Sequence, residues 1–181
     1  DYVDLFAREV HIRTCQTIHQ FKTIYGFNVQ SDGSGSASYF SFSGLTGATP
    51  DGRKDRDVFN DGTVSPVPGT DKKGPTAVLK SVAKIDPLLT FNHLFNQRWM
   101  PEFLEGDNKS KFVSYLRTFV DLGIHHIQGN VIDDKVLVDA QKHPDNYQTL
   151  VVRVAGFSAY FVDMATEVQD QIIARTKQRL S

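Results

Sequence analysis

One short peptide near the C-terminal end joins an apolar strand to a glycine and to aromatic residues. It reads Arg153-Val-Ala-Gly-Phe-Ser-Ala-Tyr-Phe161. In a structural interpretation, Gly156 forms a tight turn at positive φ, which glycine adopts without strain. In a chemical interpretation, the α-carbon of Gly156 carries an unpaired electron, because a residue without a Cβ can become planar and its amide nitrogen and carbonyl together stabilise a radical. The pattern leaves both interpretations open.

Other residues that do chemistry in proteins are present without the spacing that such chemistry needs. The six histidines form no H-E-x-x-H pair or other close ligand set, so we expect no metal site. His125 and His126 would point to opposite faces of a strand. No G-x-S-x-G elbow or phosphate-binding loop occurs. The single cysteine, Cys15, lies within a predicted helix, and we interpret it as a small, partly buried thiol.

Composition excludes several classes of protein. The chain has 181 residues, of which 40% are apolar, enough for the core of one ordinary domain or two small ones. A net charge of −1 offers no footprint for nucleic acid or for an anionic membrane surface. No apolar run is long enough to span a bilayer. One cysteine and no signal-like segment fit a reducing, cytoplasmic setting.

Helices and strands are predicted to alternate, which indicates an α/β fold with a partly parallel sheet or part of a barrel. Thr76 and Asp133 are the expected N-caps of two helices, and Thr166 forms a capping box with Gln169 at the last one. Residues 149–155 have the composition of a strand buried on both faces. The expected elements are helices over 3–21, 76–86, 109–122, 134–142 and from 166 onward, and strands over 38–43, 88–97, 124–132 and 149–155.

Residues 44–75 form the longest segment without a periodic apolar pattern. They contain six glycines and four prolines, with turn signals at Pro50-Asp51-Gly52 and Asp61-Gly62. A loop of this length inside a compact domain is uncommon and is usually functional or disordered. The pattern favours an ordered surface connection.

The chain closely resembles the pyruvate formate-lyase-like glycyl radical enzymes over nearly its whole length. Residues 153–175, RVAGFSAYFVDMATEVQDQIIAR, are similar to the glycyl radical motif of that family, with Phe157 where tyrosine is commoner. The PDGR and DAQKHP features resemble the dehydratase/lyase branch. Further similar segments are GATPDGR at 47–53, DKKGPTAVLKS at 71–81, NQ at 96–97, HIQGNV at 126–131 and DAQKHP at 139–144.

The resemblance implies a fold larger than this chain. We expect an α/β fold that forms the later part of a ten-stranded α/β barrel, with the C-terminal glycyl radical loop and helix. A helical segment over 1–30 would pack on the barrel. Late barrel strands and helices would occupy 31–140, with a long ordered loop at 44–75, and the glycyl radical domain would occupy 141–181. We therefore expect the chain to be the C-terminal part of a longer enzyme.

The resemblance also implies a reaction. Gly156 matches the glycine from which a radical-SAM activase with an iron–sulfur cluster removes a hydrogen. The stored radical then passes to an upstream cysteine, whose thiyl radical attacks a substrate C–H bond and leads to C–O, C–N, C–S or C–C cleavage. That cysteine is absent here, and Cys15 is not assigned its role. The loop around the radical would comprise Arg153, Val154, Ala155, Phe157, Ser158, Ala159 and Tyr160.

The resemblance identifies classes of partner but does not identify the substrate. We expect the activase, the cysteine-bearing rest of the enzyme and a homodimer of the full enzyme, in oxygen-sensitive anaerobic metabolism, with no bound cofactor and no nucleic acid or membrane. Four residues are candidates for lining the substrate: Phe40, Phe42, Gln128 and Asn130. For Gln128 and Asn130 the alternative is that they satisfy backbone groups. An alternative function is a stand-alone repair or subunit module that docks on a cysteine-bearing chain.

Overall fold

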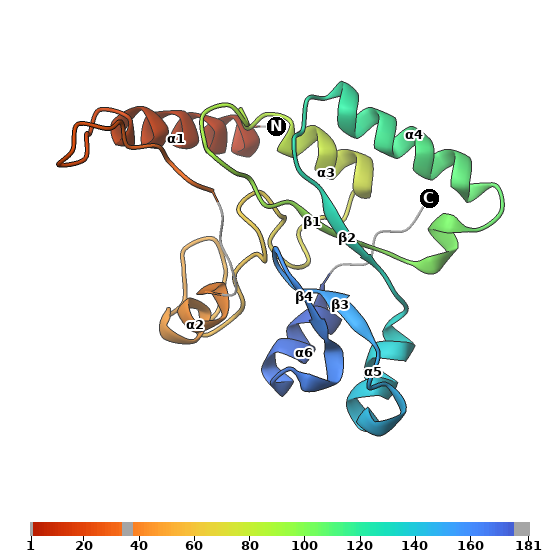
Figure 1. Cartoon of the computed structure of the whole chain (residues 1–181). Coiled ribbons are helices and arrows are strands. Elements are labelled where there is room, and N and C mark those ends of the chain that lie inside the picture. The colour runs from red at the N-terminus through yellow and green to blue at the C-terminus, as the bar shows by residue number, and fades with distance from the viewer. Residues whose placement is uncertain (1, 34–37, 176–181) are drawn as a thin grey trace.

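The computed structural model of the chain describes residues 2–33 and 38–175. A long N-terminal helix, a parallel strand pair with helices over it, and a C-terminal hairpin with two helices form its visible parts (Figure 1). The helices are α1 (Tyr2–Ile18), α2 (Ser38–Leu45), α3 (Pro75–Val82), α4 (Asn108–Asp121), α5 (Asp134–Lys142) and α6 (Thr166–Ala174). The strands are β1 (Asn96–Trp99), β2 (Gln128–Val131), β3 (Val151–Arg153) and β4 (Ser158–Tyr160), and short 3-10 turns lie at Pro101–Leu104, Pro144–Asn146 and Phe161–Asp163.

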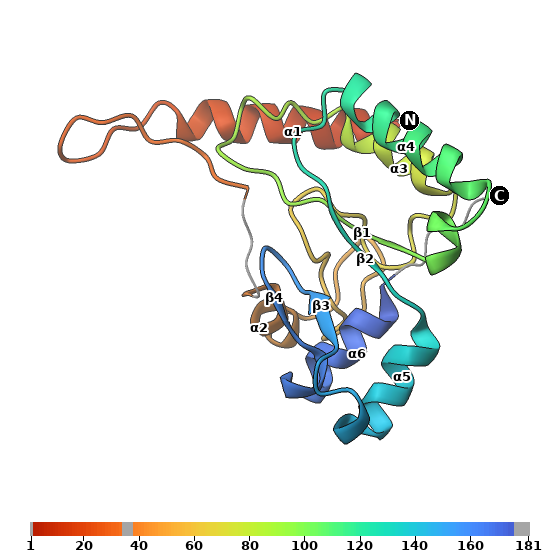
Figure 2. The same ribbon diagram turned by 45° about the vertical axis from the view of Figure 1, so that its right-hand side comes forward.

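Helix α1 forms an arm whose C-terminal end, with the loop after it, projects away from the other elements (Figures 1 and 2). Its first turn is tied to the body by an ion pair between Asp4 and Lys84. Further along, Cys15 is buried, and its Sγ lies 3.3 Å from the hydroxyl of Ser31, which also donates to the carbonyl of Leu89 at 2.9 Å. Cys15 is therefore a structural thiol, more deeply buried than expected.

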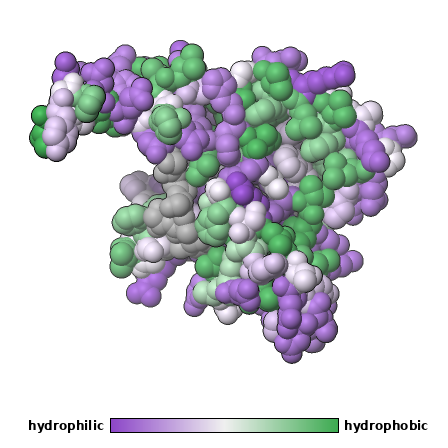
Figure 3. Space-filling model, viewed as in Figure 1, coloured by the Kyte–Doolittle hydropathy of each residue, from purple (hydrophilic) through white to green (hydrophobic). Residues whose placement is uncertain are grey.

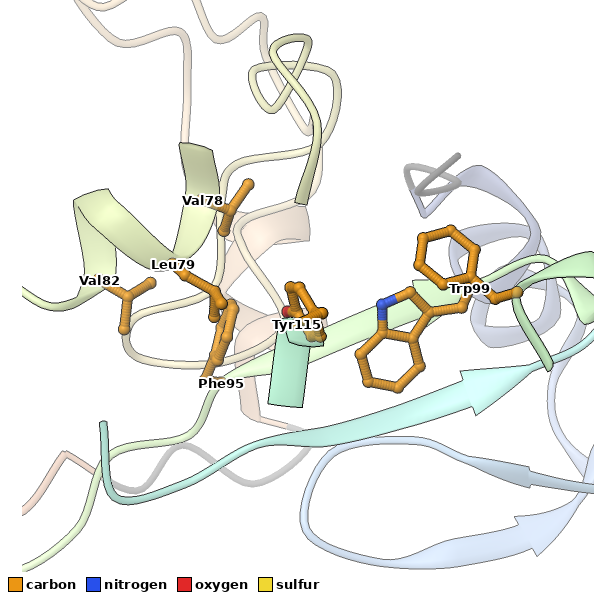
Figure 4. Packing of buried hydrophobic residues seen from close by; sticks show 7 residues of the cluster. Val78, Leu79, Val82, Phe95, Trp99 and Tyr115 are labelled. Atoms are coloured by element: carbon orange, nitrogen blue, oxygen red, sulfur yellow. The ribbon is translucent and has the colours of Figure 1, made fainter. Parts of the chain in front are cut away.

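The parallel strands β1 and β2 pair from Asn96 with Gln128 to Trp99 with Val131, so the expected parallel pairing is confirmed. Because side chains alternate along a strand, β1 presents different residues to its two faces. Trp99 points toward α4, where its ring lies 5.9 Å from the ring of Tyr115. Around it α3, α4 and β1 build the first hydrophobic core (Figure 4), made of Val78, Leu79, Val82, Phe95, Trp99, Phe103 and Tyr115.

A second hydrophobic core holds the C-terminal part together. Strands β3 and β4 form an antiparallel hairpin with Val152 opposite Ala159, and α5 and α6 pack beside it (Figure 2). Ile172 of α6 is fully buried in this cluster. The cluster consists of Leu137, Ala140, Val152, Val154, Phe161 and Ile172.

The predicted strand over 38–43 is wrong, because this segment is helix α2. A strand must pair its backbone with a neighbour, and within the described residues no strand lies beside this one. A helix instead satisfies its own backbone. The hydroxyl of Ser43 caps this arrangement by bonding the Tyr39 carbonyl and accepting from the Phe59 amide at 2.9 Å.

Several element boundaries and caps also differ from expectation. Strands β2 and β3 are shorter than predicted, and β1 covers 96–99 instead of 88–97. Strand β3 is not buried on both faces, since Val151 is 54% exposed. Helix α3 begins after Gly74 with Pro75 in its first turn, so Thr76 is not its cap. Ala165, rather than Thr166, precedes α6 as its N-cap, and Gln169 donates to two carbonyls before the helix instead of completing a capping box. The Asp133 cap of α5 is confirmed.

The loop over 44–75 is ordered around one buried arginine. The guanidinium of Arg53 donates to the carbonyls of Thr46, Gly47 and Asp57 and lies 4.5 Å from the ring centroid of Phe59. A guanidinium has five N–H donors in a fixed plane, so one side chain can gather several loop carbonyls. The arginine of the PDGR sequence thus holds the loop in one conformation through its hydrogen bonds.

The surface carries both polar and apolar regions. On the face seen in Figure 3, apolar residues gather over the middle and right of the molecule, and the lower end around α5 is mostly hydrophilic. Within the described residues, no helix combines the length and apolar content needed to cross a bilayer.

Candidate functional site

Gly156 lies at the tip of the β3–β4 hairpin. The amide of Val154 donates to the carbonyl of Phe157 at 2.9 Å, which closes a tight turn around Ala155 and Gly156. Gly156 has φ of +77°, a positive value that glycine adopts without strain and that other residues rarely adopt. The structural interpretation of Gly156 as a turn residue is therefore confirmed, and the chemical one is compatible with it.

The α-carbon of Gly156 is sterically free. A Cβ built on Gly156 would have no atom within 4 Å beyond its chain neighbours, so one Cα–H bond faces open space in this chain. The residues just before it are held differently, because Val154 and Ala155 are each only 1% exposed. In this turn, the two residues before Gly156 are buried, and the α-carbon of Gly156 is accessible.

Strand β2 holds the upstream strand of the hairpin through side chains. Asn130 accepts from the amide of Arg153 at 2.7 Å and donates to the carbonyl of the same residue at 2.8 Å. Gln128 accepts from the Nε–H of Arg153. Asn130 fits the alternative that it satisfies backbone groups, whereas Gln128 bonds a side chain. The buried Nε2 of Gln128 has no partner in the described part of the chain.

Arg175 connects the turn to the long loop. Its two terminal nitrogens donate to the carbonyls of Arg153 and Val154, at 2.9 and 2.5 Å. Its Nε lies 2.6 Å from a carboxylate oxygen of Asp61. One guanidinium therefore joins α6, the residues before Gly156 and the loop over 44–75.

A second buried arginine supports the helix behind the hairpin. Arg98 of β1 is 1% exposed, donates to the carbonyls of Ile172 and Ile173 at the end of α6, and pairs with Asp134 at the start of α5. Burial and the nearby positive charge of Arg175 lower the pKa of Arg98 to about 10, which still leaves it charged near neutral pH. Arg98 fixes the end of the helix that carries Arg175.

The remaining predicted loop residues lie around the turn with different exposure. Phe157 and Tyr160 are 44% and 49% exposed on the hairpin, whereas Ala159 packs partly against the second hydrophobic core. Ser158 accepts from a terminal nitrogen of Arg153 at 3.4 Å across the two strands. Phe157 adjoins Gly156 in the chain, whereas Tyr160 lies opposite Val151 at the other end of the hairpin.

The placement of Phe40 and Phe42 does not follow the expectation. Both belong to helix α2 rather than to the predicted strand, so they do not follow the side-chain alternation of a strand. Phe42 is 61% exposed, and the side chain of Phe40 lies outside the described part of the structure. Among the candidate lining residues whose side chains the structure describes, Gln128 and Asn130 contact the hairpin.

Two of the histidines, His93 and His126, make hydrogen bonds within the fold. His126 precedes β2 and its Nδ1 accepts from the Phe95 amide at 3.0 Å, and His93 bonds the hydroxyl of Thr90 at 2.7 Å. Burial is the main cause that lowers the pKa of both imidazoles, and the charge of Arg153 contributes for His126. Among the residues that the structure describes, no three His, Cys, Asp or Glu side chains converge in a way that could hold a metal ion.

The sequence patterns did not identify Asp61, Arg98 and Arg175, the charged residues that support the Gly156 turn from other elements. Asp61 appeared only as part of a turn signal, and Arg175 only as the last residue of the matched motif. Arg98 stands in a short strand with nothing in its neighbours to mark it. Only the position of Arg175 at the end of a long conspicuous motif offered a signal.

Comparison with known proteins gives consistent relatives. The family model described as "Glycine radical" matches residues 60–162, more than half of the chain. Trans-4-hydroxy-L-proline dehydratase of Clostridioides difficile is 36% identical over 98% of this chain, and indoleacetate decarboxylase of Tractidigestivibacter scatoligenes is 44% identical over 74% of it. The chain spans only 23% and 15% of these two proteins.

A solved structure agrees in shape as well as in sequence. The glycerol-bound B12-independent glycerol dehydratase of Clostridium butyricum superposes with a TM-score of 0.92 at 43% identity, over 98% of this chain and 23% of that protein. Gly156 falls within the residues that the family model matches, and the likeness extends over nearly all of the chain. The chain therefore belongs to the family of the glycyl radical enzymes, as its resemblance predicted.

Proposed function

We propose that this chain is the radical-storing part of a glycyl radical lyase and that Gly156 carries the radical. The observation that supports this most is the Gly156 turn itself. It has an unobstructed Cα–H bond, a positive φ and two buried residues immediately before it. Such a turn presents one α-carbon while the strand below it stays fixed.

The chemistry that we propose at Gly156 is homolytic. An activase radical takes one hydrogen atom from the α-carbon, so the Cα–H bond breaks and one electron stays on carbon. In the next step the α-carbon takes a hydrogen atom from a cysteine S–H group, which restores glycine and leaves a thiyl radical. A side chain at residue 156 would oppose the planar geometry that lets the nitrogen and carbonyl share the electron.

The cysteine and the substrate are proposed to lie in the rest of the enzyme. Cys15 is buried in α1 beside Ser31 and is an unsuitable candidate for the thiyl. The relatives include proteins named as a dehydratase, a decarboxylase and an isethionate sulfite-lyase, which supports cleavage of a C–O, C–C or C–S bond after C–H abstraction. Barrel closure by further strands, a homodimer, a cytoplasmic location and a lining role for Gln128 and Asn130 stay predictions.

The direct test is electron paramagnetic resonance after anaerobic activation. The enzyme that contains this chain should give a doublet, because one α-hydrogen remains on the Gly156 radical. Gly156→Ala should abolish the doublet. Exposure of the activated enzyme to air should cut the chain at Gly156 and release a short C-terminal peptide that mass spectrometry identifies.

The matched control is Gly123→Ala. Gly123 also has positive φ, +68°, and a Cβ there would meet no atom within 4 Å, so both substitutions carry the same strain of about 1–2 kcal/mol. Gly123 lies at the end of α4, away from the hairpin, and its variant should keep the doublet. A doublet that persists in Gly156→Ala, or no doublet in wild type with an activase shown to be active on another substrate, would refute the proposal.

A further inference from the structure

We propose that Arg175 is a positioning residue that sets where the Gly156 turn lies, and that Asp61 orients Arg175 for this task. The inference rests on the proposed radical role of Gly156. It is carried by the contacts of one guanidinium with two consecutive carbonyls before the turn and with one carboxylate from a distant loop.

The geometry uses all three nitrogens of Arg175. The two terminal nitrogens bond successive carbonyls, of Arg153 and Val154, and Nε faces Asp61. A planar guanidinium presents these donors in fixed directions, so binding Asp61 on one edge aims the others at the strand. A lysine ammonium cannot reproduce this arrangement, because it is a single point of charge.

The hairpin is held mainly by its upstream strand. From outside, Asn130 and Arg175 bond the backbone of Arg153 and Val154. No atom beyond the chain neighbours lies near the Cβ position of Gly156, so no contact there can fix the turn. Within the described residues, the carbonyl oxygen of Val154 is the backbone atom closest in sequence to Gly156 that a side chain from another element binds. Arg175 therefore acts where a small shift is passed directly to the α-carbon.

Burial gives the interaction its strength. The side chains of Arg175 and Asp61 are only 12% and 15% exposed, whereas the pair of Arg13 with Glu9 is 77% and 53% exposed. Charged hydrogen bonds sheltered from water are stronger than exposed ones, and removing one partner leaves the other buried without compensation. The pair borders a cavity of about 40 Å³ that Tyr39, Phe59 and Arg98 also line.

The first measurement is amide hydrogen exchange of the β3–β4 segment in the intact enzyme. Arg175→Gln should raise exchange of the Arg153 and Val154 amides about tenfold, because charge-assisted bonds to the strand are lost. Arg175→Lys should restore only part of the protection. The matched control is Arg117→Gln, since Arg117 is an exposed arginine of α4, and it should leave exchange in the hairpin unchanged.

A double-mutant cycle tests the role of Asp61. Asp61→Asn keeps the size of the side chain and removes its charge, so it should raise exchange less than Arg175→Gln. If Asp61 acts through Arg175, the double variant should behave as Arg175→Gln alone. Additive effects would overturn the assignment of Asp61.

The functional readout separates positioning from folding. Activated Arg175→Gln should still show the glycyl doublet, but turnover per spin should fall about tenfold or more with KM unchanged, since displacement of about 1 Å costs large factors in rate. Unchanged exchange in the hairpin, or unchanged turnover per spin, would overturn the inference. Absence of a doublet in every variant and in wild type would instead refute the radical role of Gly156, and the exchange results would still show whether Arg175 holds the hairpin.

Discussion

Replacing Gly129 with alanine should strongly destabilise the first hydrophobic core. Gly129 lies on β2 beneath the indole of Trp99, and a Cβ there would come within 2.8 Å of Cε3 and Cη2 and closer still to Cζ3. The ring cannot turn aside easily, because Phe112 and Tyr115 pack edge-on against it with centroids 5.3 and 5.9 Å away. Either the strand or the ring must therefore move.

The magnitude lies between two known cases. Overpacking of a core costs about 1–3 kcal/mol, and loss of a buried tryptophan costs about 3–5 kcal/mol. We expect Gly129→Ala to lower the free energy of unfolding by about 3 kcal/mol. With a urea m-value of about 2 kcal/mol/M, the midpoint should fall by about 1.5 M.

Tryptophan fluorescence is a suitable assay, because Trp99 is the single tryptophan of the 181 residues and lies at the perturbed site. The matched control is Gly47→Ala, where a Cβ would meet nothing within 4 Å, and its midpoint should change by less than about 0.25 M. In a Trp99→Leu background, followed by circular dichroism, Gly129→Ala should cost much less, because the overlapping ring is gone. A Gly129→Ala midpoint within about 0.25 M of wild type would refute the reasoning.

Two further predictions concern the loop and the pH response. Arg53→Ala should make the segment 44–75 sensitive to thermolysin, since three carbonyls and the ring of Phe59 lose their shared partner. Lys54→Gln, at the exposed neighbouring residue, should leave the cleavage rate unchanged. Equal cleavage rates for Arg53→Ala and wild type would contradict this role for Arg53. Because His126 accepts from Phe95 and its folded pKa is lowered, its contribution to stability is present above the unfolded value of about 6.5 and is lost as pH falls through the folded pKa. His126→Gln should therefore show a smaller decline of Tm between about pH 7 and 5 than wild type or the exposed-site control His19→Gln. Parallel Tm curves for His126→Gln and wild type would exclude His126 as the source of the decline.

Some elements of the fold were predictable from local physics. Asp133 caps α5 because its carboxylate accepts from the Lys135 amide at 3.0 Å, a bond between near neighbours. Gly123 ends α4 with positive φ, and Pro144 prevents α5 from continuing. Each of these features depends on residues a few positions apart, so pattern and spacing carry the information.

Other elements could not be predicted from such patterns. Residues 38–43 consist of serine and aromatic residues, with Tyr39 and Phe40 adjacent, and a strand and a helix can both accommodate them. The choice depends on whether a pairing neighbour is present. The predicted capping box of Thr166 does not form, because the side chain of Gln169 donates to the carbonyls of Phe161 and Met164 instead. Competition between partners is decided only when the chain has folded.

By itself, the sequence determined which residue is the candidate for the radical and which family the chain resembles, because both are written in a continuous peptide around Gly156. It also determined the main helices, since helix formation is governed by contacts three and four residues apart. Only the tertiary structure decided what holds the Gly156 turn. Asp61, Asn130 and Arg175 come from a loop, a strand and a helix end, and they meet because two hydrophobic cores pack with a polar junction between them.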